Sequence, residues 1–305
     1  MPSIERRFFL LLKALGKVAF AAVVFLALNV IVSIPLGIVG GIIAAMQSAG
    51  PLTAESITEL MMSHPLLKTA AFSLSAAAGV GTAALLYHTM EKDRSWSLGW
   101  KQERWFPKLV AGLVWGAALI TLCYLIVLSL GGIRVAGTGE GGALALLLAL
   151  DVIVFAAVAI GEETFSRGYV YGVVKRQGGI AAAVAVSSLL FALLHANNAA
   201  VFETPFPMLN LTLAGVMLAL FREWSGGLWL PIGVHLTWNY FQGDVLGMAV
   251  SGVRTPSLLE VDILDPFLAG GDFGLEGSFV TTLVMLAVSA WLWLRIRRRS
   301  RLQNG

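Results

Sequence analysis

Long apolar stretches separated by short polar connections dominate the chain. The hydrocarbon core of a bilayer is ~30 Å thick and needs about 20 apolar residues in a crossing helix. Eight stretches reach or approach this length. They cover approximately residues 17–46, 65–88, 106–131, 143–174, 180–195, 208–221, 228–250 and 279–294. The fifth and sixth are short, so they must tilt or extend into their loops. The pattern predicts an all-α polytopic bundle of about eight transmembrane helices.

Basic residues predict the orientation of these helices, because short cytoplasmic loops are rich in Lys and Arg. With the N-terminus inside, the inner connections carry Lys92, Arg94, Lys101, Arg104, Lys108, Lys175, Arg176 and Arg222, followed by an arginine-rich tail. The outer connections carry only Lys68, Arg134 and Arg254. Eight crossings with both termini cytoplasmic fit every loop, and we expect a multi-pass protein of the cytoplasmic (plasma) membrane.

Composition agrees with a membrane protein and excludes several other classes. Only 13% of the residues are charged, whereas an ordinary soluble domain has about 25%. The net charge is +3, and the one basic block directly follows the last apolar stretch. A flank of that kind faces lipid headgroups, so we expect no nucleic-acid partner. Cys123 is the only cysteine, which excludes an intramolecular disulfide and a cysteine-cluster metal site.

Three regions follow from this pattern. Residues 1–105 hold the N-terminal spans and a cytoplasmic loop, and their first apolar stretch is too long for a cleaved signal peptide, so we expect a retained anchor. Residues 106–250 form the expected catalytic core. Residues 251–305 hold an acidic outer segment, the last span and the basic tail. The acidic segment, residues 251–278, either caps the structure or lies on its surface.

Three charges interrupt the fourth apolar stretch. A carboxylate at membrane depth costs at least ~2.5 kcal/mol, so adjacent Glu162 and Glu163 indicate a function. Glu163 and Arg167 are four residues apart and share a helix face, which predicts mutual neutralisation. Glu162 lies ~100° round the helix and lacks that partner. It is either catalytic or a buried neutral acid, for example one bonded to Ser166. Asp151 lies eleven residues before Glu162 and therefore on nearly the same helix face. It either lines the same cavity as Glu162 or forms a hydrogen bond to a neighbouring helix.

Two further apolar stretches carry polar residues at helical spacing. Phe191 and His195 share one face, so the phenyl ring can pack against the imidazole and restrict its rotamer. His235 and Asn239 also share one face and both can donate hydrogen bonds. They serve either as contacts between helices or as part of a site. The joint occurrence of these residues with Glu162 in neighbouring stretches favours a functional site.

This residue set contains the groups required for hydrolysis. A carboxylate and an imidazole that share a water can act as general base and acid, while further donors stabilise the oxyanion of an attacked carbonyl. The same types also form a known zinc set, here Glu162, His195 and His235, with an open position for water. The residues alone leave both routes open: a route without a cofactor, and a route with zinc.

The motifs also resemble those of a known family. Glu-Glu-x-x-x-Arg-Gly begins at Glu162, Phe-x-x-x-His ends at His195, and His-x-x-x-Asn spans His235 to Asn239. Together, in this order, they resemble the CPBP intramembrane protease family. That family contains the CAAX prenyl endopeptidases and bacterial proteins linked to bacteriocin processing and self-immunity.

The resemblance implies a role for each matching residue. Glu162 and His195 would polarise the attacking water, and His235 and Asn239 would stabilise the oxyanion. The charged pair beside Glu162 would then support the site. The implied activity is that of an intramembrane endopeptidase acting on a peptide or membrane-protein segment, and no prenylated substrate follows from these residues.

Two other classes compete with this interpretation. A proton- or ion-coupled transporter could use the acids and histidines as a relay without breaking a bond. A catalytically inert immunity or scaffold protein could keep the polar cluster for stability. The sequence predicts no oligomeric state.

Overall fold

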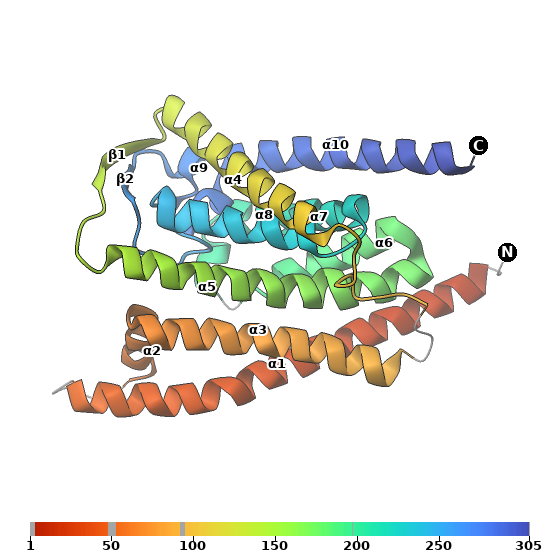
Figure 1. Cartoon of the computed structure of the whole chain (residues 1–305), viewed down its shortest axis with the longest axis horizontal. Helices are drawn as coiled ribbons and strands as arrows, with labels where there is room; N and C mark the ends of the chain where they lie inside the picture. Colours follow the sequence, from red (N-terminus) through yellow and green to blue (C-terminus); the bar gives the residue numbers. More distant parts are fainter. Residues whose placement is uncertain (1–3, 48–52, 92–94, 197, 305) are drawn as a thin grey trace.

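The chain forms an elongated bundle of helices that run close to its long axis (Figure 1). The computed structural model describes residues 4–47, 53–91, 95–196 and 198–304. Lys92 and Arg94 of the predicted inner connections lie outside these residues. The α-helices and strands are α1 (Ile4–Gln47), α2 (Ala54–Ser63), α3 (Pro65–Met90), α4 (Trp105–Ser129), β1 (Ile133–Thr138), α5 (Leu144–Glu163), α6 (Tyr171–Leu193), α7 (Pro205–Ser225), α8 (Trp229–Tyr240), β2 (Leu259–Ile263), α9 (Pro266–Ala269) and α10 (Phe279–Asn304). Short π and 3-10 segments are η1 (Thr164–Val170), η2 (Ala199–Phe202), η3 (Phe241–Val245), η4 (Gly271–Phe273) and η5 (Leu275–Gly277).

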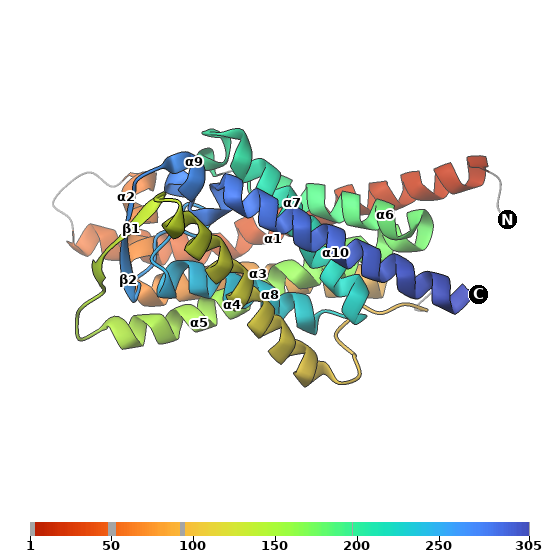
Figure 2. The same cartoon turned by 90° about the horizontal axis from the view of Figure 1, so that it is seen from above.

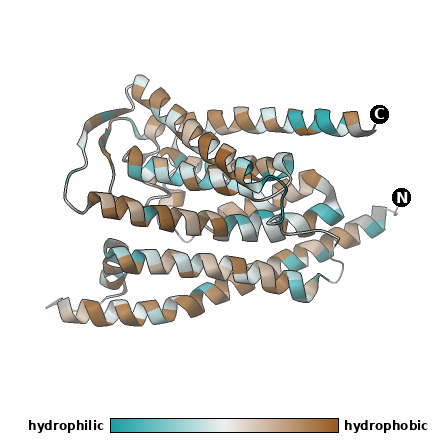
Figure 3. Cartoon of the chain, in the orientation of Figure 1, coloured by the Kyte–Doolittle hydropathy of each residue, from teal (hydrophilic) through white to brown (hydrophobic). Residues whose placement is uncertain are grey.

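The helices confirm an all-α polytopic membrane bundle. Within the described part of the chain, six helices are long and apolar enough to cross a membrane, and Figure 3 shows their predominantly hydrophobic colouring. The longest, Leu144–Leu193, contains Gly179 in a non-helical conformation with φ 78°. It therefore covers two of the predicted stretches, 143–174 and 180–195. Helix α8 has only 12 residues and continues as η3. The number of crossings stays a prediction.

The two ends of the bundle differ: one holds both chain termini and the other holds a small β-sheet (Figure 1). The start of α1 and the end of α10 lie at the same end (Figure 1), as an even number of crossings requires, while the cytoplasmic orientation of that end stays a prediction. At the opposite end β1 pairs antiparallel with β2, from Ile133 opposite Ile263 to Thr138 opposite Leu259. The hydropathy pattern predicts neither this small sheet nor α2, because both lie in polar connections.

The acidic outer segment is packed against the bundle. Figure 2 shows α9 beside the sheet and close to the start of α10. Phe273 and Leu275 are almost completely buried. Gly274 has φ +81°, and a Cβ there would collide with the carbonyl oxygen of Ala249. Of the two alternatives for this segment, capping is therefore the one that the fold adopts.

Small residues bring the central helices into close contact. A Cβ on Gly112 or Gly116 of α4 would collide with backbone atoms of α8, and Gly233 of α8 approaches α4 equally closely. On the other side of the core, Gly161 of α5 meets Ala76 of α3. Such residues let membrane helices pack backbone against backbone. The contacts hold α5 and α8 in a fixed relation to their neighbours.

We expect the substitution Gly161→Ala to destabilise the bundle by about 1–3 kcal/mol, as overpacking typically does. The added Cβ would lie 2.5 Å from the Cα of Ala76, so α5 and α3 would have to separate. Thermal unfolding of the purified protein in detergent measures the effect. Gly81→Ala on α3 is the matched control, because a Cβ there meets nothing within 4 Å. Equal melting temperatures for the two variants would contradict the packing argument.

Candidate active site

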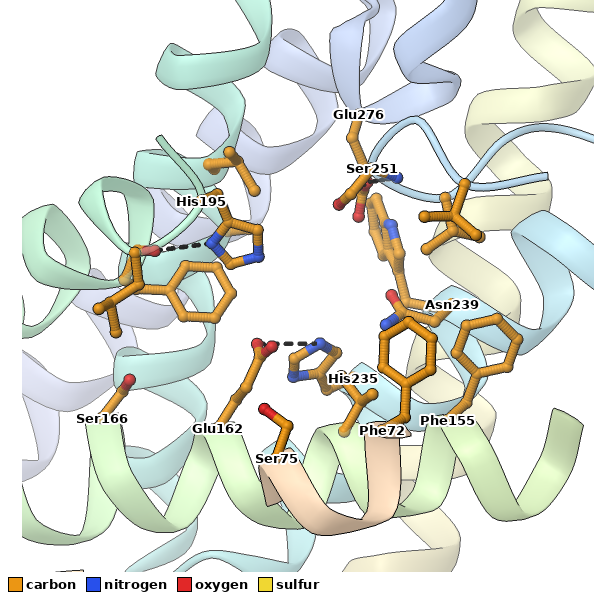
Figure 4. Close-up of a pocket in the computed structure, with 18 of the residues that line it drawn as sticks. Phe72, Ser75, Phe155, Glu162, Ser166, His195, His235, Asn239, Ser251 and Glu276 are labelled. Atoms are coloured by element: carbon orange, nitrogen blue, oxygen red, sulfur yellow. Dashed lines mark hydrogen bonds and ion pairs between the residues drawn. The ribbon is translucent and has the colours of Figure 1, made fainter. Parts of the chain in front are cut away.

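One cavity of about 480 Å³ collects the four candidate catalytic residues. Glu162, His195, His235 and Asn239 all line it, and Figure 4 shows their side chains directed into a common space. The volume lies in the range typical of ligand pockets, and most of the lining is apolar. The fold therefore brings together residues from three separate stretches of the sequence, as predicted.

Two π-helical segments adjoin the candidate residues. Glu162 and Glu163 are the last residues of α5, and η1 follows directly, with the N–H of Tyr171 bonded to the carbonyl of Ser166. Segment η3 begins two residues after Asn239. Segments with i→i+5 bonds are rare and occur frequently at functional sites, because they alter the direction of side chains along a helix. The backbone therefore departs from regular α-helix next to Glu162 and Glu163 and again next to Asn239.

The predicted neutralisation of Glu163 by Arg167 is confirmed. Arg167 Nη1 lies 2.8 Å from Glu163 Oε1, and both side chains are completely buried. Arg167 Nη2 also donates to the carbonyl of Gly215 at 3.3 Å, and the guanidinium carbon lies 4.2 Å from the ring centroid of Phe191. Desolvated charges persist only with such a set of partners.

His235 lies between the two glutamates. Its Nδ1 is 3.1 Å from Glu163 Oε1, and its Nε2 is 3.9 Å from Glu162 Oε2. Because Glu163 is ionised by its pairing with Arg167, it can only accept, so Nδ1 of His235 carries a hydrogen. Nε2 is therefore the nitrogen that faces the cavity and Glu162.

Glu162 has the freedom that a reacting group needs. Its side chain is 32% exposed, in contrast to the fully buried Glu163. Its Oε2 has no hydrogen-bond partner among the described residues. The structural alternative, a hydrogen bond between Glu162 and Ser166, is not formed within that part of the chain, although Ser166 lines the cavity.

His195 is fixed by Phe191, as the spacing predicts. The two ring centroids are 4.9 Å apart, and His195 Nδ1 lies 2.8 Å from the Phe191 carbonyl oxygen. A carbonyl can only accept, so Nδ1 carries a hydrogen, and in the neutral ring Nε2 has a free lone pair. His195 follows the end of α6 at Leu193, in a turn, rather than lying within the predicted span. Phe191 consequently contacts both His195 and the buried Arg167.

A second buried ion pair explains Asp151. Its carboxylate lies 2.5 Å from Lys68 Nζ, and both side chains are nearly inaccessible. Of the two alternatives for Asp151, contact with a neighbouring helix is therefore the one observed. The sequence pattern predicts an outer connection for Lys68, whereas the fold places this residue in the first turn of α3, at the wall of the cavity.

The capping segment contributes Glu276, a cavity residue that the sequence analysis missed. Its Oε2 accepts hydrogen bonds from the backbone N and the hydroxyl of Ser251, both at 2.7 Å. Burial raises the pKa of the Glu276 carboxyl, while the two Ser251 donors and the nearby His195 and His235 act in the opposite direction. Glu276 is one of several acids in its segment, and no spacing distinguishes it from the others.

The zinc alternative requires several ligands grouped around one position. Among the residues that the structure describes, no group of three His, Cys, Asp or Glu side chains is arranged to hold a metal ion. Both imidazoles use Nδ1 within the protein, His235 toward Glu163 and His195 toward a carbonyl, which leaves Nε2 as the nitrogen open to the cavity. We therefore derive no chemical step through a metal.

Comparison with known proteins supports the resemblance inferred from the motifs. Residues 143–241 match the family described as type II CAAX prenyl endopeptidase Rce1-like. The matched range contains the four candidate residues and the pair Glu163–Arg167, but not Glu276 or the first helices. Neither the curated proteins nor the solved structures gave a match to this chain.

Proposed function

We propose that this chain, whose residues 143–241 match the Rce1-like family of type II CAAX prenyl endopeptidases, is a membrane-embedded endopeptidase. The observation that carries the proposal is the convergence of Glu162, His195, His235 and Asn239 on one largely apolar cavity of a multi-pass membrane protein. Apolar walls suit a peptide segment from a membrane, and the four polar groups suit the hydrolysis of an amide.

The proposed reaction begins with a water held between Glu162 and His195. The carboxylate of Glu162 accepts a proton from this water, whose oxygen attacks the carbonyl carbon of the scissile bond. Nε2 of His195 carries a lone pair and accepts a hydrogen bond from the same water, which fixes its direction. General acid–base catalysis of this kind contributes ~10²–10⁴-fold to a rate.

Asn239 and His235 then hold the negatively charged oxygen of the tetrahedral intermediate. The Asn239 amide donates directly. Nδ1–H of His235 is committed to Glu163, so its Nε2 donates only when the ring carries a second proton. Carboxylates beside both nitrogens favour that imidazolium. When the C–N bond breaks, Glu162 returns its proton to the leaving amine, and the protonation states of the free protein are restored.

An unbiased comparison of membrane-derived and secreted peptides tests this proposal. Purified wild type in lipid nanodiscs is incubated with the peptides, and new termini are identified by mass spectrometry. We expect cleavage products that are absent with the Glu162→Gln variant. Prenylated and unprenylated versions of each cleaved peptide then define the substrate class. Ion flux across proteoliposomes without any cleavage would favour the transporter alternative instead.

Metal dependence is tested separately. We expect the active protein to retain its rate with well under one equivalent of bound metal, measured by elemental analysis after dialysis against a chelator. The reason is that the described residues include no cluster of three His, Cys, Asp or Glu side chains that could hold a metal ion. Activity that rises in proportion to added zinc and saturates at one equivalent would contradict this expectation.

A further inference from the structure

A second carboxylate faces the cavity from the side opposite to Glu162. Figure 4 shows Glu276 and Ser251 at one wall of the cavity and Glu162, beside His235, at the other. Glu276 is part of the capping segment, outside the family match of residues 143–241. The proposed hydrolysis does not use it.

The two carboxylate oxygens of Glu276 differ in the hydrogen bonds that they accept. Oε2 accepts both hydrogen bonds from Ser251. Oε1 accepts none from any residue that the structure describes, and no lysine or arginine within that part of the chain forms an ion pair with Glu276. A carboxylate has about four acceptor sites, so half of its capacity is unused by the described residues.

The surrounding network holds Glu276 in this position. The completely buried Asn210 of α7 donates to the carbonyl of Glu276 at 2.8 Å and to that of Ser278 at 2.9 Å. Asn198 donates to the carbonyl of Ser251 at 2.7 Å. Buried side-chain bonds from separate elements thus fix both the residue and the loop that anchors it, a degree of restraint typical of groups that bind a ligand.

The charges lining the cavity favour a cationic ligand group at this wall. Among the described residues, Lys68 is the one lysine or arginine that lines it, and that side chain is already paired with Asp151. The lining acids in the same part of the chain are Glu162 and Glu276. Glu276 lines the same cavity as His195 and His235, so a group bound to its carboxylate shares that cavity with the candidate catalytic residues.

We infer that Glu276 is a specificity residue that binds an ammonium or guanidinium group of the peptide, carried by a side chain close to the bond that is cleaved. This inference deepens the proposed function and rests on it for the nature of the bound segment. It assigns a preference for a lysine or arginine beside an apolar stretch.

Binding of matched peptides tests the inference without requiring cleavage. Fluorescent apolar peptides carry Lys, Gln or Glu at one scanned position, and anisotropy reports their affinity for protein in nanodiscs of zwitterionic lipid. At the best position we expect wild type to bind the Lys peptide ~10-fold more tightly than the Gln peptide. Glu276→Gln should bring this ratio close to one, and Glu276→Lys should favour the Glu peptide.

Controls separate a binding role from a structural one. Glu260→Gln removes an acid of the same outer region that does not line the cavity, and it should keep the wild-type ratio. Ser251→Ala removes one anchor of Glu276 and should lower the melting temperature without reversing the charge preference. An unchanged ratio in Glu276→Gln, or no charge preference in wild type at any position, would overturn the inference.

Failure of this inference can be distinguished from failure of the proposed hydrolase function. Glu162→Gln should still prefer the Lys peptide although it cleaves nothing. A Lys preference in a protein that cleaves no peptide would refute the hydrolase and leave the specificity residue standing. Cleavage with no charge preference would do the reverse.

Discussion

Replacing Glu162 by Gln is expected to lower kcat by ~10²–10⁴-fold, the contribution of general acid–base catalysis. Gln has nearly the same shape but cannot accept the proton of the attacking water. Folding should be unaffected, since Glu162 Oε2 makes no hydrogen bond with the described residues and its side chain is partly exposed. Initial rates on a cleaved peptide, with the melting temperature of the same preparation, measure both effects.

The kinetic signature of Glu162→Gln should be a loss of turnover rather than of substrate binding. If Glu162 acts as the base, Glu162→Gln has a lower cleavage rate than wild type at every substrate concentration, whereas KM changes little. The matched control is Glu260→Gln, an exposed acid of β2 that should cleave at the wild-type rate. A Glu162→Gln protein that cleaves as fast as wild type would remove this residue from the mechanism.

Replacing Glu163 by Gln is expected to destabilise the protein by about 3–5 kcal/mol, the typical cost of leaving a buried charge without its partner. Arg167 is fully buried and Glu163 is its only charged partner within 4 Å among the described residues. The substitution should also suppress activity, because Glu163 holds Nδ1 of His235. Thermal unfolding and turnover are measured on the same variant.

A second substitution separates these two effects. Adding Arg167→Met to Glu163→Gln removes the orphaned cation, so much of the stability should return while activity stays low. The exposed pair Arg134–Asp262 supplies the control, with side chains 67% and 46% exposed. Asp262→Asn should cost at most ~1 kcal/mol. If Glu163→Gln were equally mild, the buried pair would not have the structural importance argued above.

Helical periodicity was sufficient to predict most of the core of the site. Residues four apart on a helix lie on one face, so the contacts of Glu163 with Arg167 and of Phe191 with His195 follow from spacing alone. The apolar stretches likewise predict the helices, because a bilayer sets their length. The convergence of separate stretches on one cavity was inferred from the joint occurrence of rare polar residues, and the fold agrees.

Contacts between segments distant in sequence could not be predicted in this way. Glu276 meets Ser251 through a compact loop whose course depends on glycines and buried aromatic residues, and no periodic pattern encodes it. Lys68 was misassigned for a related reason. A lysine near the end of an apolar stretch normally indicates an exposed flank, and only the partner Asp151, from another helix, reveals that it is buried.

The two π segments also determine how strictly chain length is constrained around the site. Each successive residue of an α-helix is rotated by ~100°, so loss of one residue from η1 would turn Arg167 and all of α6 relative to Glu163. The same loss in η3 would turn the capping segment relative to Asn239. A single insertion or deletion between Glu163 and Arg167 would separate groups that must meet. Spacing is therefore the property of this region that evolution and protein engineering have the least freedom to change.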